Sequence, residues 1–314
     1  MITHIMYNST MHTLISDSID ISVIYTENYI INKLVILLRG AEMKTLKKIV
    51  LLILTTTNFA LQEETKCVQI NIDGVNYVQE LLKDNVDKPY NLVIDKEKDM
   101  VYFSYGVDIE KDEFNSAYIN LVTKDFATIA GVNNGFTQAV DKKTHEVYIG
   151  GRDGIYKYKV GGKADLIAEK GTNIWYVYFD DMLYFSTFPS QFLYTYDGEV
   201  KRLSELENTN VDLFVLDGED IYFVNRDGLK KKAKDDDIEL IEEFAENYPR
   251  CLIENAREIY ICIKDSVYKL KKPEQTLEKV FNATDIYGLA IDDDDNIIYS
   301  DSSNVYRLNK DKAC

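Results

Sequence analysis

The stretch Phe136-Thr-Gln-Ala-Val-Asp-Lys-Lys-Thr-His-Glu-Val-Tyr148 joins an apolar run to an aliphatic–tyrosine pair through a polar turn. Two strand-like runs around such a turn are typical of a β-hairpin. The aliphatic–tyrosine pair recurs along the chain at a spacing of about 40 residues, which is the length of one β-propeller blade. The six pairs are Val101-Tyr102, Val147-Tyr148, Leu183-Tyr184, Ile221-Tyr222, Ile259-Tyr260 and Ile298-Tyr299.

Each repeat contains four short strand-like segments, the fourth of which is seen in Ala164-Asp-Leu-Ile-Ala168 and Ile238-Glu-Leu-Ile241. Six such repeats predict an all-β fold, a six-bladed β-propeller with four antiparallel strands in each blade. The last repeat has no fourth strand before Cys314, whereas Tyr77-Val-Gln-Glu-Leu-Leu82 is a spare strand. We expect this N-terminal strand to complete the last blade and close the ring, because an open ring would expose two sheet edges. The tyrosine pairs fall on the second strand of each blade, where they should pack one sheet against the next.

The amino-terminal region contains the features of a secretory signal. Met43-Lys-Thr-Leu-Lys-Lys48 is basic, the apolar run that follows is too short to span a membrane, and cleavage is expected near Ala60. Residues 43–60 are therefore predicted to be a signal peptide, and residues 61–314 a single propeller domain. Because a signal peptide begins a chain, residues 1–42 are interpreted as a mispredicted upstream extension. A genuine leader with an internal anchor is the alternative.

All four cysteines follow the predicted signal, and an even number of cysteines in a secreted chain predicts disulfides. Cys251 and Cys262 lie symmetrically about the turn Asn255-Ala-Arg-Glu258, so we expect them to bond across one hairpin. The remaining pair, Cys67 and Cys314, would then join the two ends of the domain. Asn282 begins an Asn-Ala-Thr sequon for N-glycosylation.

The composition argues against several classes of protein. A formal net charge of −17 disfavours nucleic acids and anionic membranes, because both bind basic surfaces. His145 is the only histidine after Ala60, and it lies in a polar turn that we expect to be solvated. Catalytic triads and zinc sites need positioned histidines or clustered cysteines, so no catalytic residue, metal site or cofactor is predicted. Asp292-Asp-Asp-Asp295 is interpreted as a solvated turn, with calcium binding as the alternative.

A ligand is expected at the propeller axis, on the face where the chain enters the innermost strands and where second strands connect to third strands. In five of the six repeats an aromatic residue is placed there, which suits a flat organic ligand, and Arg250 is placed to bind a carboxylate. The alternative is that these aromatic side chains wedge adjacent blades together. The predicted site residues are Tyr90, Asn91, Phe136, Gln138, Trp175, Tyr176, Asp212, Tyr248, Arg250 and Tyr287.

Several segments resemble the ommochrome-binding proteins of insect (lepidopteran) haemolymph. They are Ile129-Ala-Gly-Val-Asn-Asn-Gly-Phe-Thr-Gln-Ala-Val140, His145-Glu-Val-Tyr-Ile-Gly-Gly-Arg-Asp-Gly-Ile-Tyr-Lys-Tyr158 and Asp87-Lys-Pro-Tyr-Asn-Leu92 with Tyr102-Phe-Ser-Tyr105. The resemblance implies a secreted, extracellular carrier that binds xanthommatin or a related tryptophan-derived phenoxazinone pigment without transforming it. Such pigments are planar and carry amino-acid carboxylates. No contact residue is carried over from the family, so the predicted positions rest on propeller geometry.

Two other functions remain open from the sequence. Six-bladed propellers of the gluconolactonase type are similar in outline and use a divalent metal on the axis, for which Asp212, Asn91 and Asn173 are the obvious ligands near the mouth. A yellow-type insect propeller that binds another small molecule, such as an amine, is the third interpretation. We expect a monomer that binds a small planar organic ligand non-covalently, with neither nucleic acid nor membrane as a partner.

Overall fold

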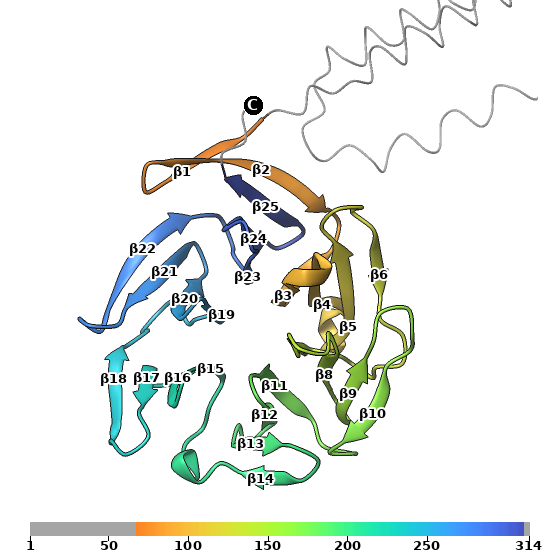
Figure 1. The fold of residues 1–314 in the computed structure, drawn as a ribbon, viewed down its shortest axis with the longest axis vertical. Helices are drawn as coiled ribbons and strands as arrows, with labels where there is room; N and C mark the ends of the chain where they lie inside the picture. The colour runs from red at the N-terminus through yellow and green to blue at the C-terminus, as the bar shows by residue number, and fades with distance from the viewer. Residues whose placement is uncertain (1–66, 311–314) are drawn as a thin grey trace, which may run out of the picture. The chain divides into compact units, whose positions relative to one another are not determined.

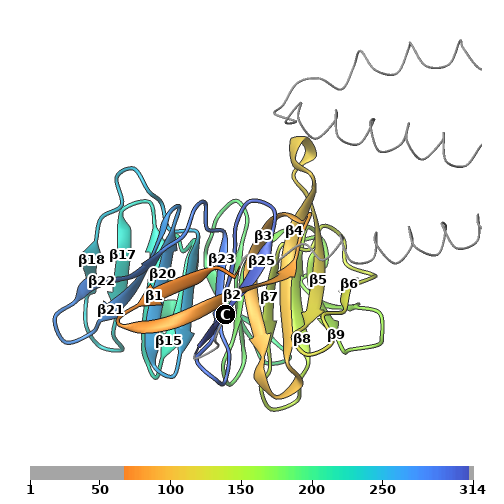
Figure 2. The same ribbon diagram turned by 90° about the horizontal axis from the view of Figure 1, so that it is seen from above.

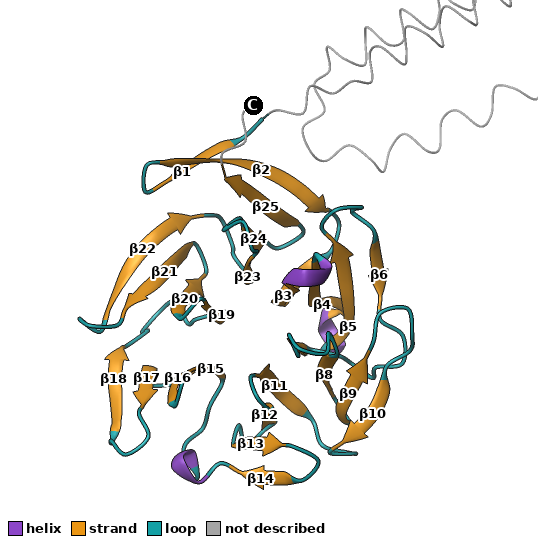
Figure 3. Ribbon diagram, viewed as in Figure 1, coloured by secondary structure: helices purple, strands orange, loops and turns teal. Residues whose placement is uncertain are grey.

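The computed structural model describes residues 67–310, which form a ring of six antiparallel sheets around a central axis (Figure 1). Five sheets have four strands and the sixth has five, so the predicted six-bladed β-propeller is confirmed. Helical structure in the described range is limited to single 3₁₀ turns (Figure 3) at η1 (Lys96–Lys98), η2 (Ile109–Lys111) and η3 (Ser204–Leu206). The predicted signal peptide and the upstream extension both lie outside the described residues.

The blades follow one another along the chain, and each begins at the axis and ends at the rim. Blade 1 contains β3 (Asp87–Asp95), β4 (Met100–Asp108), β5 (Glu113–Asn120) and β6 (Phe126–Thr128). Blade 2 contains β7 (Thr137–Val140), β8 (Val147–Gly151), β9 (Gly154–Tyr158) and β10 (Asp165–Ala168). Blade 3 contains β11 (Ile174–Phe179), β12 (Leu183–Thr187), β13 (Leu193–Tyr196) and β14 (Val200–Arg202).

Blade 4 contains β15 (Leu213–Asp217), β16 (Asp220–Asn225), β17 (Gly228–Lys232) and β18 (Ile238–Glu242). Blade 5 contains β19 (Cys251–Asn255), β20 (Glu258–Ile263), β21 (Ser266–Lys271) and β22 (Thr276–Asn282). Blade 6 contains β23 (Gly288–Ile291), β24 (Ile297–Ser300) and β25 (Val305–Lys310), together with β2 (Val75–Lys83) and β1 (Gln69–Ile72) from the start of the domain.

The N-terminal strand closes the ring as predicted. Strand β2 pairs antiparallel with β25, from Tyr77 opposite Lys310 to Leu81 opposite Tyr306. Strand β1 adds a fifth strand that the sequence reasoning did not anticipate, joined to β2 by a tight turn at Asp73-Gly74. Both turn residues have positive φ, of 50° and 83°, which is the geometry that Asp-Gly favours in two-residue hairpins.

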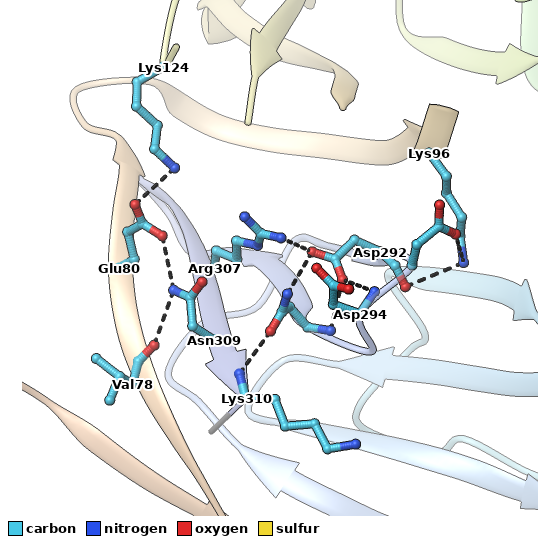
Figure 4. A network of polar contacts seen from close by, with 11 residues as sticks. Val78, Glu80, Lys96, Lys124, Asp292, Asp294, Arg307, Asn309 and Lys310 are labelled. Carbon is cyan, nitrogen blue, oxygen red and sulfur yellow. Dashed lines mark hydrogen bonds and ion pairs between the residues drawn. The ribbon is translucent and has the colours of Figure 1, made fainter. Parts of the chain in front are cut away.

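A polar network links the closing strand β2 to strand β25 and to blade 1 (Figure 4). The Glu80 carboxylate accepts a hydrogen bond of 2.9 Å from the Asn309 amide of β25. Its other oxygen lies 2.8 Å from the Lys124 ammonium, which belongs to the β5–β6 turn of blade 1. Glu80 therefore connects the first and last blades at the point where the ring closes.

The acidic turn of blade 6 is only partly solvated, which corrects one expectation. Asp292 is 5% exposed, and its Oδ1 accepts the backbone N–H groups of Asp294 at 3.0 Å and Asn296 at 2.9 Å. Its Oδ2 forms an ion pair with Arg307 (Figure 4). The buried carboxylate thus organises the turn, and residues 67–310 contain no cluster of three or more His, Cys, Asp or Glu side chains arranged to hold a metal.

The aliphatic–tyrosine pairs pack blade on blade, as predicted. Successive residues of a strand point to opposite faces of its sheet, so each pair contacts both neighbouring blades. Val101 packs in the core shared with blade 6, whereas Tyr102 packs with Val147 in the core shared with blade 2. In blade 6 the order is reversed, because Ile298 faces blade 1 and Tyr299 faces blade 5.

The hairpin disulfide is present where the sequence placed it. Cys251 and Cys262 are directly opposite in the β19–β20 register, with Cα atoms 5.0 Å apart. The second predicted bridge involves Cys314, which lies outside the described residues. Asn282, the predicted glycosylation site, is exposed at the end of the outer strand β22. Over the part of the chain that the structure describes, no helix is long and apolar enough to cross a membrane.

Candidate functional site

The innermost strands β3, β7, β11, β15, β19 and β23 surround the axis (Figure 1). We call the face where the chain enters these strands the mouth face, and the opposite face, where each first strand turns into the second, the turn face. Loops between second and third strands also lie on the mouth face. Figure 2 shows the disc from its edge, with the β4–β5 hairpin projecting beyond the other loops.

Four predicted aromatic residues come together on the mouth face and pack ring against ring. The Tyr90 ring centroid lies 5.1 Å from that of Tyr287 and 5.8 Å from that of Phe136, and Phe136 lies 5.5 Å from Trp175. Such distances are those of aromatic pairs in contact. The side chains therefore pack against one another between consecutive blades.

Two further aromatic residues extend this cluster and were missed from the sequence. The ring centroid of Phe114 lies 4.9 Å from that of Phe136, and the ring centroid of Phe188 lies 5.7 Å from that of Trp175. Phe114 is the second residue of β5 and Phe188 follows β12, so both lie where second strands connect to third strands. The expectation that these loops share the mouth face was the signal that could have identified them. The six rings, Tyr90, Phe114, Phe136, Trp175, Phe188 and Tyr287, are called the aromatic cover below.

Asp212 anchors a polar group beside the aromatic cover. Its carboxylate accepts hydrogen bonds from the Tyr248 hydroxyl and the Gln191 amide, and its carbonyl accepts one of 3.1 Å from the Trp175 indole. Burial raises the pKa of Asp212 above its ordinary value, while the hydrogen bonds from Tyr248 and Gln191 and the charge of Arg226 oppose the shift. Burial and the contact with Asp212 raise the pKa of Tyr248 as well. This predicted pair thus holds the Trp175 side of the cover in place.

Arg250 is held by groups of its own blade interface. Its Nη1 donates to Asp285 Oδ1 at 2.8 Å and to the Ile286 carbonyl at 3.1 Å, and its guanidinium lies 4.2 Å from the centroid of the Tyr287 ring. Asp285 already supplies a carboxylate to Arg250, through one hydrogen bond. A ligand carboxylate at this position would have to compete with Asp285.

A cavity lies on the axis behind the aromatic cover. Its volume is about 120 Å³. Within the described chain its lining leaves out all six residues of the aromatic cover and includes three of the predicted residues, Asn91, Gln138 and Tyr176. Further along the axis it is lined by Tyr178, Phe179, Val215, Leu252, Leu289 and Ala290. We call this space the axial cavity.

The deep end of the axial cavity is polar but tightly organised. Asn91 donates to the Phe136 carbonyl at 3.0 Å, and the Tyr176 hydroxyl reaches from blade 3 to the Leu252 carbonyl of blade 5 at 3.4 Å. Burial raises the pKa of Tyr176. Gln138 is 2% exposed, and its Nε2 donates to Ser116 at 3.2 Å. Its Oε1 is buried with no hydrogen-bond partner among the described residues.

The rim of the axial cavity on the turn face is charged. Lys96 and Lys142 line the cavity from turns that follow first strands, and Glu254 and Asn255 line it from the end of the first strand β19. The Lys96 ammonium donates a hydrogen bond of 2.8 Å to Asn255 Oδ1, so this side chain reaches from blade 1 to blade 5. Lys142 is exposed, which shows that the cavity meets solvent on this face.

His145 does not lie in a freely solvated turn, which corrects another expectation. Its Nδ1 lies 3.0 Å from Asp95 Oδ2, and its Nε2 lies 3.3 Å from Glu97 Oε2. Asp95 is 2% exposed, so the imidazole covers a buried carboxylate. The contact ties the first turn of blade 2 to that of blade 1.

No protein-family model matches the chain. A relative from Manduca sexta, the "Ommochrome-binding protein", is 30% identical over 258 residues, which cover 79% of this chain and 92% of the relative. The chain belongs to the ommochrome-binding protein family. This confirms the resemblance seen in the sequence.

Solved structures similar to this member of the ommochrome-binding protein family share its fold. A gluconolactonase from Xanthomonas campestris superposes with a TM-score of 0.60 at 10% identity, covering 74% of this chain and 90% of that one. A putative gluconolactonase superposes with a TM-score of 0.59 at 10% identity, covering 80% of this chain and 96% of that one. A luciferin-regenerating enzyme superposes with a TM-score of 0.57 at 12% identity, covering 74% of this chain and 95% of that one. Identities this low establish a common propeller fold alone.

Proposed function

We propose that this protein is a non-enzymatic carrier that binds an ommochrome pigment, xanthommatin or a related tryptophan-derived phenoxazinone, on the propeller axis. The observation that supports it most directly is the relationship to a protein named for ommochrome binding. The axial cavity supplies a place for the pigment, since ligand sites are concave spaces with mostly apolar walls.

The walls of the axial cavity suit a flat conjugated molecule. Tyr176 and Tyr178 lie on one face of strand β11 and Phe179 lies on the other, and all three line the cavity together with aliphatic side chains of the other inner strands. Aromatic side chains bind planar rings by stacked or edge-on contact, and the aliphatic side chains complete an apolar slot. Of the predicted residues, Asn91, Gln138 and Tyr176 would contact the pigment directly, and the aromatic cover would keep solvent from its inner end. The pigment is bound as a ligand, with no cofactor.

The carrier is proposed to act as a monomer in extracellular fluid such as haemolymph. The Cys251–Cys262 bond and the exposed sequon at Asn282 both suit a protein that folds in the secretory pathway. The signal features of residues 43–60 point the same way.

A hydrolase of the lactonase type is the second candidate, because the fold is shared with gluconolactonases. Its metal would bind near Asp212 and Asn91. In the structure both of these side chains form hydrogen bonds with protein groups, Asp212 with Tyr248 and Gln191, and Asn91 with Phe136. In a hydrolase the Asp212 carboxylate would have to exchange its hydrogen bonds with Tyr248 and Gln191 for a metal. A binder of another small molecule, such as an amine, would be distinguished by its ligand preference.

Spectroscopic titration of the purified protein with xanthommatin, with and without a chelator, tests the proposal. A carrier should give a saturable change in the pigment absorbance that the chelator does not alter. No binding at micromolar pigment would refute the carrier function, and chelator-sensitive hydrolysis of a lactone would establish the hydrolase instead.

A further inference from the structure

We propose that the ligand enters the axial cavity from the turn face and that Lys96, Lys142 and Glu254 bind an amino-acid group at its outer end. The ligand class is a planar aromatic molecule that carries an α-amino-acid substituent. This inference rests on the proposed function and adds the route, the orientation and the recognising residues. It places the opening on the face opposite to the one that the sequence predicted.

The rings of the aromatic cover pack together on the mouth face. Tyr90 contacts Tyr287, Phe136 and Phe114, and Phe136 contacts Trp175, so blades 6, 1, 2 and 3 are joined in succession on this face. Asp212 further fixes Trp175 through its backbone carbonyl. A ligand entering here would have to separate several packed rings, whereas the turn face needs only the movement of long polar side chains.

The rim charges complement an α-amino-acid group. Two ammonium groups, of Lys96 and Lys142, and one carboxylate, of Glu254, line the same opening. An amino acid presents one carboxylate and one ammonium group, so the lysines match the former and Glu254 matches the latter. Glu254 Oε1 accepts the Arg257 backbone N–H at 2.5 Å, which fixes the carboxylate in the turn.

Lys96 is placed to respond to an arriving carboxylate. Its ammonium bonds to Asn255 Oδ1 at 2.8 Å and lies 3.4 Å from the Asp292 carbonyl, both of which are neutral acceptors. Its ion pair with Asp293 is longer, at 3.5 Å, and that carboxylate is 66% exposed. A hydrogen bond to a carboxylate is stronger than one to an amide oxygen, so the ligand can displace Asn255 from Lys96. The Lys96 side chain then changes partner without leaving the rim.

Gln138 provides an acceptor at the inner end. Its Oε1 is buried, has no partner among the described residues and belongs to a side chain that lines the axial cavity. A buried acceptor of this kind is satisfied when a bound molecule donates an N–H or O–H group to it. The ligand is thus expected to have a hydrogen-bond donor on its ring system, opposite its amino-acid end.

The test compares four methionine variants of the full chain by pigment titration. Lys96→Met and Lys142→Met remove the rim cations. Lys143→Met is the matched control, because Lys143 neighbours Lys142 but pairs with Asp181 on the exposed surface at 3.1 Å. Arg250→Met probes the mouth face. Two probes are used, xanthommatin and an uncharged phenoxazinone that lacks the amino-acid group.

Each rim variant should weaken xanthommatin binding by about 10-fold, the effect of losing one hydrogen bond to a charged group. Affinity for the uncharged phenoxazinone should stay within about twofold of the original protein, as should both affinities of Lys143→Met. Thermal unfolding of each variant separates lost binding from lost structure, and the exposed Lys142 position keeps the test valid if Lys96→Met is unstable.

Two results would overturn the inference. One is unchanged xanthommatin affinity in both rim variants while the original protein binds. The other is a loss in Arg250→Met alone, which would place the amino-acid group at the mouth face. If the original protein binds neither probe, the proposed function itself fails, and this outcome is distinct from the other two.

Discussion

The hydroxyl of Tyr102 should destabilise the protein that contains it. Tyr102 is 0% exposed in the core between blades 1 and 2, and its hydroxyl is buried with no hydrogen-bond partner among the described residues. A buried polar group without a partner costs about 1–3 kcal/mol of desolvation. Tyr102→Phe removes this group and keeps the ring, so we expect the free energy of unfolding to rise by about 1 kcal/mol after the loss of a small packing volume.

Tyr299 provides a matched comparison on the second strand of blade 6. It is 4% exposed, but its hydroxyl accepts a hydrogen bond of 2.9 Å from the Gln79 amide of the closing strand. Tyr299→Phe therefore removes a satisfied hydrogen bond and should lower the free energy of unfolding by about 1 kcal/mol. The same chemical change is thus expected to have opposite signs at the two positions.

The assay is equilibrium unfolding in urea with the Cys251–Cys262 disulfide intact, supported by thermal melting. For a domain of this size, 1 kcal/mol corresponds to a shift of about 2–4 °C in Tm. Tyr102→Phe should melt higher than the original protein and Tyr299→Phe lower. If both variants are destabilised equally, the Tyr102 hydroxyl is satisfied in solution, and the argument from its burial is wrong.

Three further perturbations follow from the fold. Glu80→Ala breaks the contacts that close the ring and should lower the free energy of unfolding in urea by about 1–2 kcal/mol. Glu199→Ala, at an exposed ion pair, should lower it by less than about 1 kcal/mol, and equal effects would contradict the role of Glu80. Replacing Cys251 and Cys262 by alanine removes a cross-link with a sequence separation of 11 and should lower the free energy of unfolding in urea by about 3 kcal/mol, according to the loop-entropy model. No loss of stability would show that the hairpin is already ordered in the unfolded chain. Burial raises the pKa of Tyr90 to about 12 from an ordinary value of 10.0, so the folded state favours the neutral phenol; this stabilisation is complete below pH 10 and is lost as the pH rises from about 10 to about 12. Tyrosinate absorbance and circular dichroism would follow ionisation and unfolding together, and ionisation of all tyrosines near pH 10 without unfolding would disprove this prediction.

The sequence predicted the architecture well because a propeller repeats one local pattern. Each aliphatic–tyrosine pair lies on a second strand, and the spare strand at Tyr77 pairs into the last blade. The direction that the pairs face was less predictable. The last interval, from Tyr260 to Tyr299, is one residue longer than the two before it, and a one-residue slip turns a side chain to the opposite face of its sheet. This explains why Tyr299 faces blade 5, in the reverse order to the other tyrosines.

The predicted site shows the same distinction between position and direction. Counting back from the tyrosine pairs gave the correct level along the axis for Tyr90, Phe136, Trp175 and Tyr287, because position along a strand depends only on local spacing. Whether those rings point into a free space or against one another depends on neighbouring blades, and no single repeat contains that information. His145 illustrates the point, since its carboxylate partners Asp95 and Glu97 belong to another repeat.

The contacts among the aromatic rings make the two ends of the propeller axis different. A ring of inner strands alone would be a tube open at both faces, through which a ligand could pass. The aromatic cover packs at one end, and the axial cavity reaches exposed Lys142 at the other. In the proposed orientation, the apolar inner part of the ligand would be shielded from water and its charged end would stay near the solvent. Because desolvating a charged group costs far more than desolvating an apolar ring, this orientation would let a zwitterionic pigment bind without burial of its charges.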